Sequence, residues 1–206
     1  MVLIMVEEID QYMKPHGKKG IEIIESMNEE HVYISEFAFE CVNINEDDRI
    51  LDIGCGGGIN IAKFLKLAHE VDGIDYSEVS VSKSIEKNKI AVDEGRCKII
   101  QANVSSIPFE DNSYDLVSAF STIFFWPDLV ESFKEVLRIL KPDGQFMIAQ
   151  GTDGTNPEDE ELNDAEKGIN IYTASEIEKH LKDAGFKSSE VVPSGDSHLL
   201  VVLAKK

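Results

Sequence analysis

The feature of the sequence best suited to chemistry is a glycine-rich turn that follows a short apolar run. Ile50-Leu51-Asp52-Ile53 leads into Gly54-Cys55-Gly56-Gly57-Gly58. Glycine tolerates positive φ and has no Cβ, so a ligand can approach the backbone of such a turn, and a following helix offers free N–H groups. The carboxylate of Asp52 favours a cationic ligand group, such as an ammonium, over a pyrophosphate. A purely structural loop is the alternative.

Two polar side chains follow the next apolar runs. Asp75 comes directly after Val71–Ile74 and can accept hydrogen bonds from both hydroxyls of a ribose. Asn103 follows Lys98–Gln101, and its amide can pair with an adenine edge while residues 107–109 sandwich the ring. Together with the glycine turn, these residues predict a nucleoside ligand. A helix-start acid is the alternative for Asp75, and a plain turn residue is the alternative for Asn103.

Strand and helix patterns alternate from about residue 49 onward, which is typical of a mostly parallel sheet with crossover helices. The expected strands are Arg49–Ile53, Val71–Ile74, Lys98–Gln101, Tyr114–Ala119 and Gln145–Gln150. The expected helices are Asn60–Leu67, Ser77–Asp93, Leu129–Leu140 and Ala174–Ala184. Runs at Ser189–Val192 and His198–Ala204 flank the turn cluster Pro193-Ser194-Gly195-Asp196, which predicts a closing antiparallel pair.

The remaining segments are helical or acidic. Residues 1–48 contain helical patterns at Ile21–Asn28 and His31–Val42 and are expected to form an N-terminal cap. Residues 49–206 would form the ligand-binding core of a single domain that spans 1–206, with an acidic loop at 151–170. Nine acids and no Lys or Arg occur in 21–48, and seven acids occur in 153–166. Such runs are most often solvated faces.

Composition excludes several classes of partner and site. The 206 residues include 39 acids and 20 Lys or Arg, and the net charge of −19 argues against nucleic acid and anionic membrane as partners. The apolar start Met1–Val6 is too short for a signal peptide or a membrane span, which predicts a cytoplasmic protein. Three cysteines without CxxC spacing, and no zinc-like His/Cys cluster, predict no disulfide framework and no metal site.

The sequence resembles the class I S-adenosylmethionine-dependent methyltransferases, in particular a branch of small-molecule-type enzymes. The resemblance covers roughly residues 45–186 and rests on four motifs in order, which are LDIGCGGG at 51–58, GIDYS at 73–77, ANVSSIPFEDNSYDLV at 102–117 and EVLRILKPDGQF at 135–146. It implies a Rossmann-like α/β fold with a seven-stranded, mostly parallel sheet and an antiparallel C-terminal strand. It also implies S-adenosylmethionine as cofactor and a small-molecule acceptor. The sequence does not fix the oligomeric state, and a homodimer is one candidate.

The resemblance further implies a cofactor site at the ends of the first four strands, made of Asp52, Gly54, Gly56, Asp75, Tyr76, Asn103, Val104, Ala119 and Phe120. The glycine turn and Asp52 would line the methionine part. Asp75 would bind the ribose, with Tyr76 beside the adenine. Asn103 stands where the family usually has Asp at the adenine amino group. Ala119 and Phe120 would lie beneath the sulfonium and the methyl group.

On the acceptor side, the segment 121–126 would face the substrate, with Phe124 and Trp126 as contacts. Aromatic faces can attract a cation or clamp a flat molecule. His31 and Tyr33 in the cap are candidates for a general base or a substrate contact. Packing at a helix start is the alternative for Trp126, and a structural role is the alternative for His31.

Two other functions remain open. The first is a catalytically silent protein that binds the cofactor or has a regulatory role. The second is a nicotinamide-dependent oxidoreductase, which the glycine spacing disfavours because Ile59 replaces the third glycine of the fingerprint and Asp52 would oppose a pyrophosphate. If the two acidic segments flank the acceptor pocket, a neutral or cationic acceptor is favoured over an anionic one.

Overall fold

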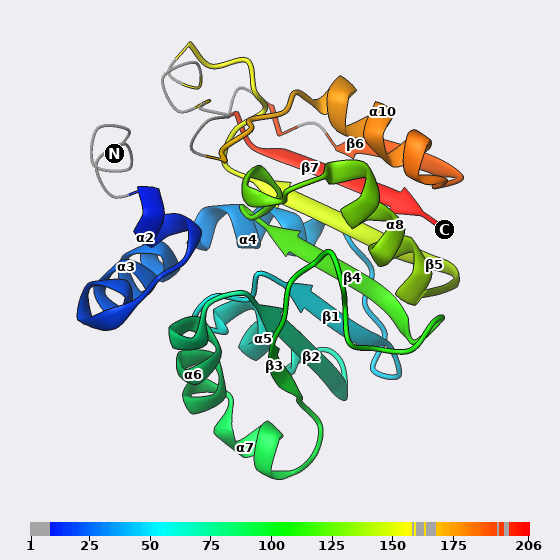
Figure 1. The fold of residues 1–206 in the computed structure, drawn as a ribbon. Helices are drawn as coiled ribbons and strands as arrows, with labels where there is room; N and C mark the ends of the chain where they lie inside the picture. Colours follow the sequence, from blue (N-terminus) through cyan, green and yellow to red (C-terminus); the bar gives the residue numbers. More distant parts are fainter. Residues whose placement is uncertain (1–8, 158, 160–162, 164–167, 193, 196–197) are drawn as a thin grey trace.

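A twisted seven-stranded sheet of order β3-β2-β1-β4-β5-β7-β6 forms the centre of the computed structural model (Figure 1). The structure describes residues 9–157, 159, 163, 168–192, 194–195 and 198–206. The strands are β1 (Arg49–Ile53), β2 (Glu70–Asp75), β3 (Ile99–Gln101), β4 (Tyr114–Phe120), β5 (Leu140–Gln150), β6 (Ser188–Val192) and β7 (Leu200–Lys205). The first five strands pair in parallel, and β7 is antiparallel to both of its neighbours. The predicted sheet and its closing antiparallel pair are confirmed.

Helices cover both faces of the sheet (Figure 1). They are α2 (Ile9–Met13), α3 (Gly17–Glu30), α4 (Val32–Glu40), α5 (Ile59–Phe64), α6 (Glu78–Lys87), α7 (Lys89–Asp93), α8 (Leu129–Ile139) and α10 (Ala174–Ala184), with a 3-10 turn η1 (Ile123–Phe125). Apolar side chains of α8 and α10 pack on one face of the sheet with Leu51 and Ile53. Those of α4, α5 and α6 pack on the other face with Ile50. Because helices cover both faces of the sheet, the central strands are mostly apolar in sequence.

The predicted helix over 77–93 is interrupted at Asn88, which separates α6 from α7. The side-chain amide of Asn88 donates to the carbonyl oxygens of Gly58 and Ser84, both at 3.0 Å. This buried side chain therefore ties the end of α6 to the glycine turn. A tertiary contact of this kind overrides the local preference for one continuous helix.

The fifth strand is longer than predicted, because it begins at Leu140 and not at Gln145. Leu140 pairs with Tyr114, and the register then shifts so that Gln145 pairs with Leu116. Asp143 adopts a positive φ of 65° within this irregularity. Residues 142–144, which fall between the predicted helix and the predicted strand, thus lie inside the strand as a bulge.

The cap contains the two predicted helices, as α3 and α4, and a short helix α2 that the sequence analysis did not predict. Helix α3 packs against α6, and α4 lies against β5. Phe39 of α4 has its ring centroid 4.6 Å from that of Phe64 and 6.2 Å from that of Phe120. The cap therefore joins the core through an aromatic cluster at the end of β4.

A charged network binds the strands together toward their amino ends. The Asp72 carboxylate accepts from the Tyr114 hydroxyl at 2.7 Å, the Arg49 guanidinium at 2.9 Å and the Lys98 backbone N–H at 2.8 Å. Asp72 is 5% exposed, so each donor offsets the cost of burying its charge. This network lies away from the carboxyl edge, where the predicted ligand residues gather.

Candidate cofactor and acceptor site

The glycine turn after β1 needs glycine for two different reasons. Gly54, Gly56 and Gly58 have φ values of 71°, 50° and 77°, which disfavour any other residue. A Cβ on Gly54 would collide with the Thr122 side chain, and one on Gly58 would lie 2.5 Å from Nδ2 of Asn88. A Cβ on Gly56 would meet nothing within 4 Å. Packing therefore fills the space at the first and last of these glycines, whereas the middle one faces open space that a ligand can enter.

Asp75, the last residue of β2, connects that strand to the glycine turn. Its Oδ2 accepts from the Gly56 backbone N–H at 2.9 Å, and its Oδ1 accepts from the Ser77 backbone N–H at 2.8 Å. Burial raises the pKa of Asp75, although these backbone donors oppose the rise. The Ser80 hydroxyl and the Tyr76 backbone N–H also act to lower the pKa of this carboxyl group. Donors from both the glycine turn and the start of α6 thus hold the carboxylate in place.

Asp52 lies on β1, the strand next to β2, and is 2% exposed. Its Oδ1 accepts from the Ser118 hydroxyl at 2.8 Å. Burial raises the pKa of Asp52 to about 7, Ser118 opposes the rise and the charge of Asp75 adds to it. A cation placed nearby would favour the ionised form, since an opposite charge lowers the pKa of a carboxyl group.

The residues after β3 occupy two different places. Asn103 is exposed, and its Oδ1 accepts from the Ser105 backbone N–H at 2.9 Å, so it closes a turn and keeps one lone pair free. Val104 is 7% exposed and packs in the core. The expected sandwich by residues 107–109 is wrong for Phe109, which packs edge-on against Tyr114 at 5.3 Å between centroids. The chain must return to the start of parallel β4, which takes this ring away from the carboxyl edge.

The turn between α2 and α3 packs on the residues that follow Asp75. The Ser77 hydroxyl donates to the Pro15 carbonyl oxygen at 2.6 Å. The ammonium of Lys14 lies 3.9 Å from the ring centroid of Tyr76, whose side chain is 52% exposed. Tyr76, predicted beside the adenine, directly follows the end of β2 and has a cation against one ring face.

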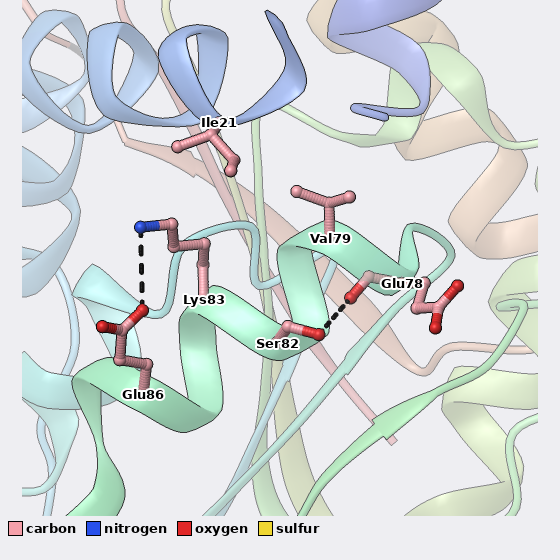
Figure 2. A pocket seen from close by; sticks show the side chains of 6 residues that line it. All are labelled: Ile21, Glu78, Val79, Ser82, Lys83 and Glu86. Carbon is pink, nitrogen blue, oxygen red and sulfur yellow. Dashed lines mark hydrogen bonds and ion pairs between the residues drawn. The ribbon is translucent and has the colours of Figure 1, made fainter. Parts of the chain in front are cut away.

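The cap also covers the glycine turn. A Cβ on Gly57 would lie 2.7 Å from atoms of both Ile24 and Asn28, so α3 contacts the turn directly. Farther along the same helix pair, Ile21 of α3 and residues of α6 line a hollow of about 280 Å³ (Figure 2). Lys83 and Glu86 in its wall pair with each other at 3.6 Å. This hollow lies between α3 of the cap and α6 of the core.

The end of β4 is strained and crowded. Ala119 is fully buried, and the ring of Phe120 packs against those of Phe39 and Phe64. Ser121 follows with a φ of 49°, an uncommon conformation for a residue with a side chain. Residues of this kind persist where the surrounding structure holds them, often at functional sites. The backbone N–H of Ser121 donates to the Ala149 carbonyl at 2.8 Å, which fixes the ends of β4 and β5 together.

The two predicted aromatic contacts for the acceptor differ in location. Phe124 is half-buried, packs edge-on against Phe125, and accepts at its carbonyl from the Asn170 N–H at 2.9 Å. Trp126 is 5% exposed and stacks on Phe146 at 6.2 Å between centroids. The structure thus places Trp126 in the core, in agreement with the packing alternative, because an apolar ring of this size gains most from burial.

The two candidates in the cap lie near the junction of α3 and α4. His31 separates the two helices and is half-buried. Tyr33 is 47% exposed, and its hydroxyl oxygen would lie 3.1 Å from a Cβ built on Gly151. Since Gly151 directly follows β5, the tyrosine hydroxyl is at the carboxyl edge of the sheet. The expected acidic loop at 151–170 falls partly outside the described residues, as does the turn cluster at 193–196.

Three other features bear on what the site can hold. Among the described residues, no group of three or more His, Cys, Asp or Glu side chains is arranged to hold a metal ion. Cys41, Cys55 and Cys97 are free thiols. In the same part of the chain, no helix combines the length and the apolar character that crossing a bilayer requires.

Sequence reasoning missed one pair at this edge, formed by His198 and Asp153. The two residues are 45 positions apart, and no local pattern connects them. It also missed Ser84 and Asn88, which pack against the glycine turn from α6. An asparagine inside a helical pattern was the one sequence feature present at the second contact, and it does not identify Gly58 as the partner.

Comparisons with known proteins agree with this geometry. The profile of a family described as a methyltransferase domain matches residues 51–148. The sterol 4-C-methyltransferase strm-1 of Caenorhabditis elegans is 28% identical over 70% of this chain and 44% of its own length. The 27-O-demethylrifamycin SV methyltransferase of Amycolatopsis mediterranei is 28% identical over 68% of this chain and 54% of its own length. The chain thus spans about half the length of these curated relatives.

Solved structures show the same fold. An S-adenosylmethionine-dependent methyltransferase from Aquifex aeolicus superposes with a TM-score of 0.73 and 21% identity, covering 89% of this chain and 97% of the other. A protein described as a putative methyltransferase of the same kind from Methanococcus maripaludis gives 0.68 and 24%, with coverages of 89% and 91%. Residues 51–148 thus match the methyltransferase-domain family, and the fold of the chain is that of S-adenosylmethionine-dependent methyltransferases of known structure.

Proposed function

We propose that the protein transfers the methyl group of S-adenosylmethionine to a small neutral or cationic molecule, bound where the cap meets the ends of β4 and β5. The observation that carries this proposal is the open space at Gly56, whose N–H is held by the Asp75 carboxylate. A cradle that lacks a side chain beside a fixed carboxylate suits a ribose with its two hydroxyls.

The residues divide the work of binding. In this proposal Asp75 accepts from the ribose hydroxyls, and Asp52 balances the ammonium of the methionine part. Phe120 and Asn103 form the remaining wall of the cofactor site, and Ala119 and Val104 support it from the core. The cofactor supplies a methyl group already activated on a sulfonium. The protein therefore contributes mainly alignment and exclusion of water.

The cap would provide that exclusion. Ile24 and Asn28 of α3 contact Gly57, while the Tyr33 hydroxyl reaches Gly151 at the end of β5. An acceptor between these two contacts would lie under the cap and over the strand ends. Phe124 is the aromatic side chain we place against it, and Tyr33 and His31 are the polar ones.

Charge supports the choice of acceptor. The cap segment 21–40 holds six acids and no Lys or Arg, and Asp153 follows the end of β5, whereas Glu46, Asp47 and Asp48 precede β1 at the opposite edge of the sheet. A site bordered by acidic groups raises the local concentration of cations and lowers that of anions. The named substrates of the two relatives, a sterol and a rifamycin, are small molecules, which supports the size class of the acceptor.

The test is the release of S-adenosylhomocysteine with a panel of small acceptors in three charge classes, at low and at high salt. We expect turnover with neutral or cationic acceptors and a preference over anions that weakens with salt. Turnover confined to anionic acceptors would contradict the charge argument. Asp75→Ala is the control. Loss of the ribose contacts should weaken cofactor binding by about 1 to 3 kcal/mol. Binding without turnover across the panel would instead support the silent cofactor-binding alternative.

A further inference from the structure

A histidine and an aspartate that no motif connects meet beside the proposed acceptor site. Nδ1 of His198 lies 3.2 Å from Oδ1 and 3.3 Å from Oδ2 of Asp153. The imidazole thus faces the carboxylate with one nitrogen and leaves the other nitrogen, Nε2, directed elsewhere. An imidazole whose Nδ1 is oriented by a carboxylate is the arrangement in which Nε2 serves as a base.

The fold places this pair at the carboxyl edge of the sheet. Asp153 comes three residues after Gln150, the last residue of β5, and His198 comes two residues before Leu200, the first of β7. Gln150 and Leu200 are partners in the antiparallel register. The pair therefore sits directly beyond the end of β5, next to Gly151, where the Tyr33 hydroxyl also lies.

Asp153 is held in position by other contacts. It accepts from the Thr155 backbone N–H at 2.9 Å and from the Thr155 hydroxyl at 2.6 Å. The next residue, Gly154, has a φ of 73°, and a Cβ there would lie 2.9 Å from the backbone of Tyr172 and Thr173. The turn that presents the carboxylate is thus built for this conformation and not free to rearrange.

The protonation of the pair follows from these donors. Burial acts to raise the pKa of Asp153, but the donors from Thr155 and His198 more than offset it, so the pKa is lowered. An ionised carboxylate only accepts hydrogen bonds, so the proton between the two groups belongs to Nδ1. In the neutral form of the imidazole, Nε2 then carries the lone pair. The side chain is 50% exposed, which leaves that nitrogen reachable.

We propose that His198, oriented by Asp153, is the general base that takes the proton of the acceptor during methyl transfer. This inference rests on the proposed function and adds the residue that performs the proton transfer. The acceptor X–H gives its proton to Nε2, the X–CH₃ bond forms as the S–CH₃ bond breaks, and the bonding pair stays on sulfur. The products are the methylated acceptor, S-adenosylhomocysteine and an imidazolium whose charge Asp153 balances.

The first test needs no acceptor. Nuclear magnetic resonance of ¹⁵N-labelled histidine distinguishes the two neutral tautomers, and His198→Asn identifies the signal. We expect the Nδ1–H tautomer in the wild-type protein and a shift toward Nε2–H in Asp153→Ala. Finding His198 as the Nε2–H tautomer in the wild type would overturn the proposal, since Nε2 would then have no lone pair to offer.

The second test uses the acceptor with the highest turnover in the panel described above. We expect His198→Asn to lower kcat by about 10²- to 10⁴-fold while the dissociation constant of S-adenosylhomocysteine changes less than about twofold. Asp153→Asn should lower kcat as well, by less. His69→Asn is the matched control, because His69 is exposed next to the start of β2 at the opposite edge, and should leave kcat unchanged.

Addition of free imidazole to His198→Ala should restore part of the turnover. Unchanged kcat in His198→Asn would refute the base and leave the proposed methyl transfer intact. No turnover in the wild-type protein would instead contradict the proposed function itself. The two failures are therefore distinguishable.

Discussion

Asp52→Asn tests how the buried carboxyl group of Asp52 affects stability and cofactor binding. The folded protein raises the pKa of this carboxyl from 3.8 to about 7 by burial. At pH values above both pKa values, this change lowers the free energy of unfolding by roughly 4 kcal/mol. The asparagine has nearly the same shape, and its oxygen can still accept from the Ser118 hydroxyl.

The sign follows from proton binding. Below pH 4 the carboxyl is protonated in both the folded and the unfolded state, so it costs nothing there. Between pH 4 and 7 the folded state binds more protons than the unfolded state, so the contribution of Asp52 to the free energy of unfolding falls as pH rises. Above pH 7 the full cost is present. Removal of the carboxyl should therefore stabilise the protein most at alkaline pH.

The assay is urea unfolding of wild type and Asp52→Asn at several pH values from 5 to 8. We expect the free energy of unfolding of the variant, relative to wild type, to increase by about 3 kcal/mol over this interval. The asparagine N–H₂ group, if unpaired, costs a pH-independent 1 to 3 kcal/mol or so, which the comparison between pH values removes. The same variant should bind S-adenosylhomocysteine more weakly, because the ammonium loses its counter-charge. A pH-independent difference between the two proteins would refute the reasoning.

Two further predictions concern residues whose neighbours are known. Gly56→Ala should reduce the free energy of unfolding by only about 1 to 2 kcal/mol, the cost of its positive φ, yet weaken cofactor binding at least tenfold. Gly54→Ala, whose Cβ would collide with Thr122, should reduce the free energy of unfolding more. Urea unfolding measures the stability and calorimetric titration with S-adenosylhomocysteine measures the binding, and equal binding by Gly56→Ala and wild type would contradict a ligand at Gly56. Tyr114→Phe removes one hydrogen-bond donor from buried Asp72 and should lower the free energy of unfolding by about 1 to 3 kcal/mol. Cofactor affinity should not change, since the Asp72 network lies away from the carboxyl edge of the sheet. A parallel loss of affinity would show that the amino and carboxyl edges of the sheet are coupled.

Local patterns predicted most of the fold, because they depend on neighbouring residues. Ile50–Ile53 is an apolar run closed by glycines, and it forms β1 and the turn as expected. Helix α10 begins and ends where predicted, with Thr173 and Glu176 forming a capping box and Gly185 in the left-handed conformation. The break at Asn88 was not predictable, because it depends on a hydrogen bond to Gly58.

The site was predictable to the extent that it follows strand ends. Asp52, Asp75 and the glycine turn come together because they end adjacent parallel strands. The sequence left the position of Trp126 open, because an aromatic residue before a proline can form a pocket wall or pack in the core. Its stacking on Phe146 places it in the core. The contact between His198 and Asp153 required the pairing of β5 with β7.

Methyl transfer itself is measured most directly with S-adenosylmethionine that carries a deuterium-labelled methyl group. The protein is incubated with this cofactor and the acceptor that the panel selects, and the product is analysed by mass spectrometry. We expect wild-type protein to produce an acceptor carrying one labelled methyl group. Asp75→Ala, which lacks the carboxylate beside Gly56, should produce far less at the same cofactor concentration. Wild-type protein that binds S-adenosylhomocysteine but labels no acceptor, or an Asp75→Ala variant as active as wild type at limiting cofactor, would contradict it.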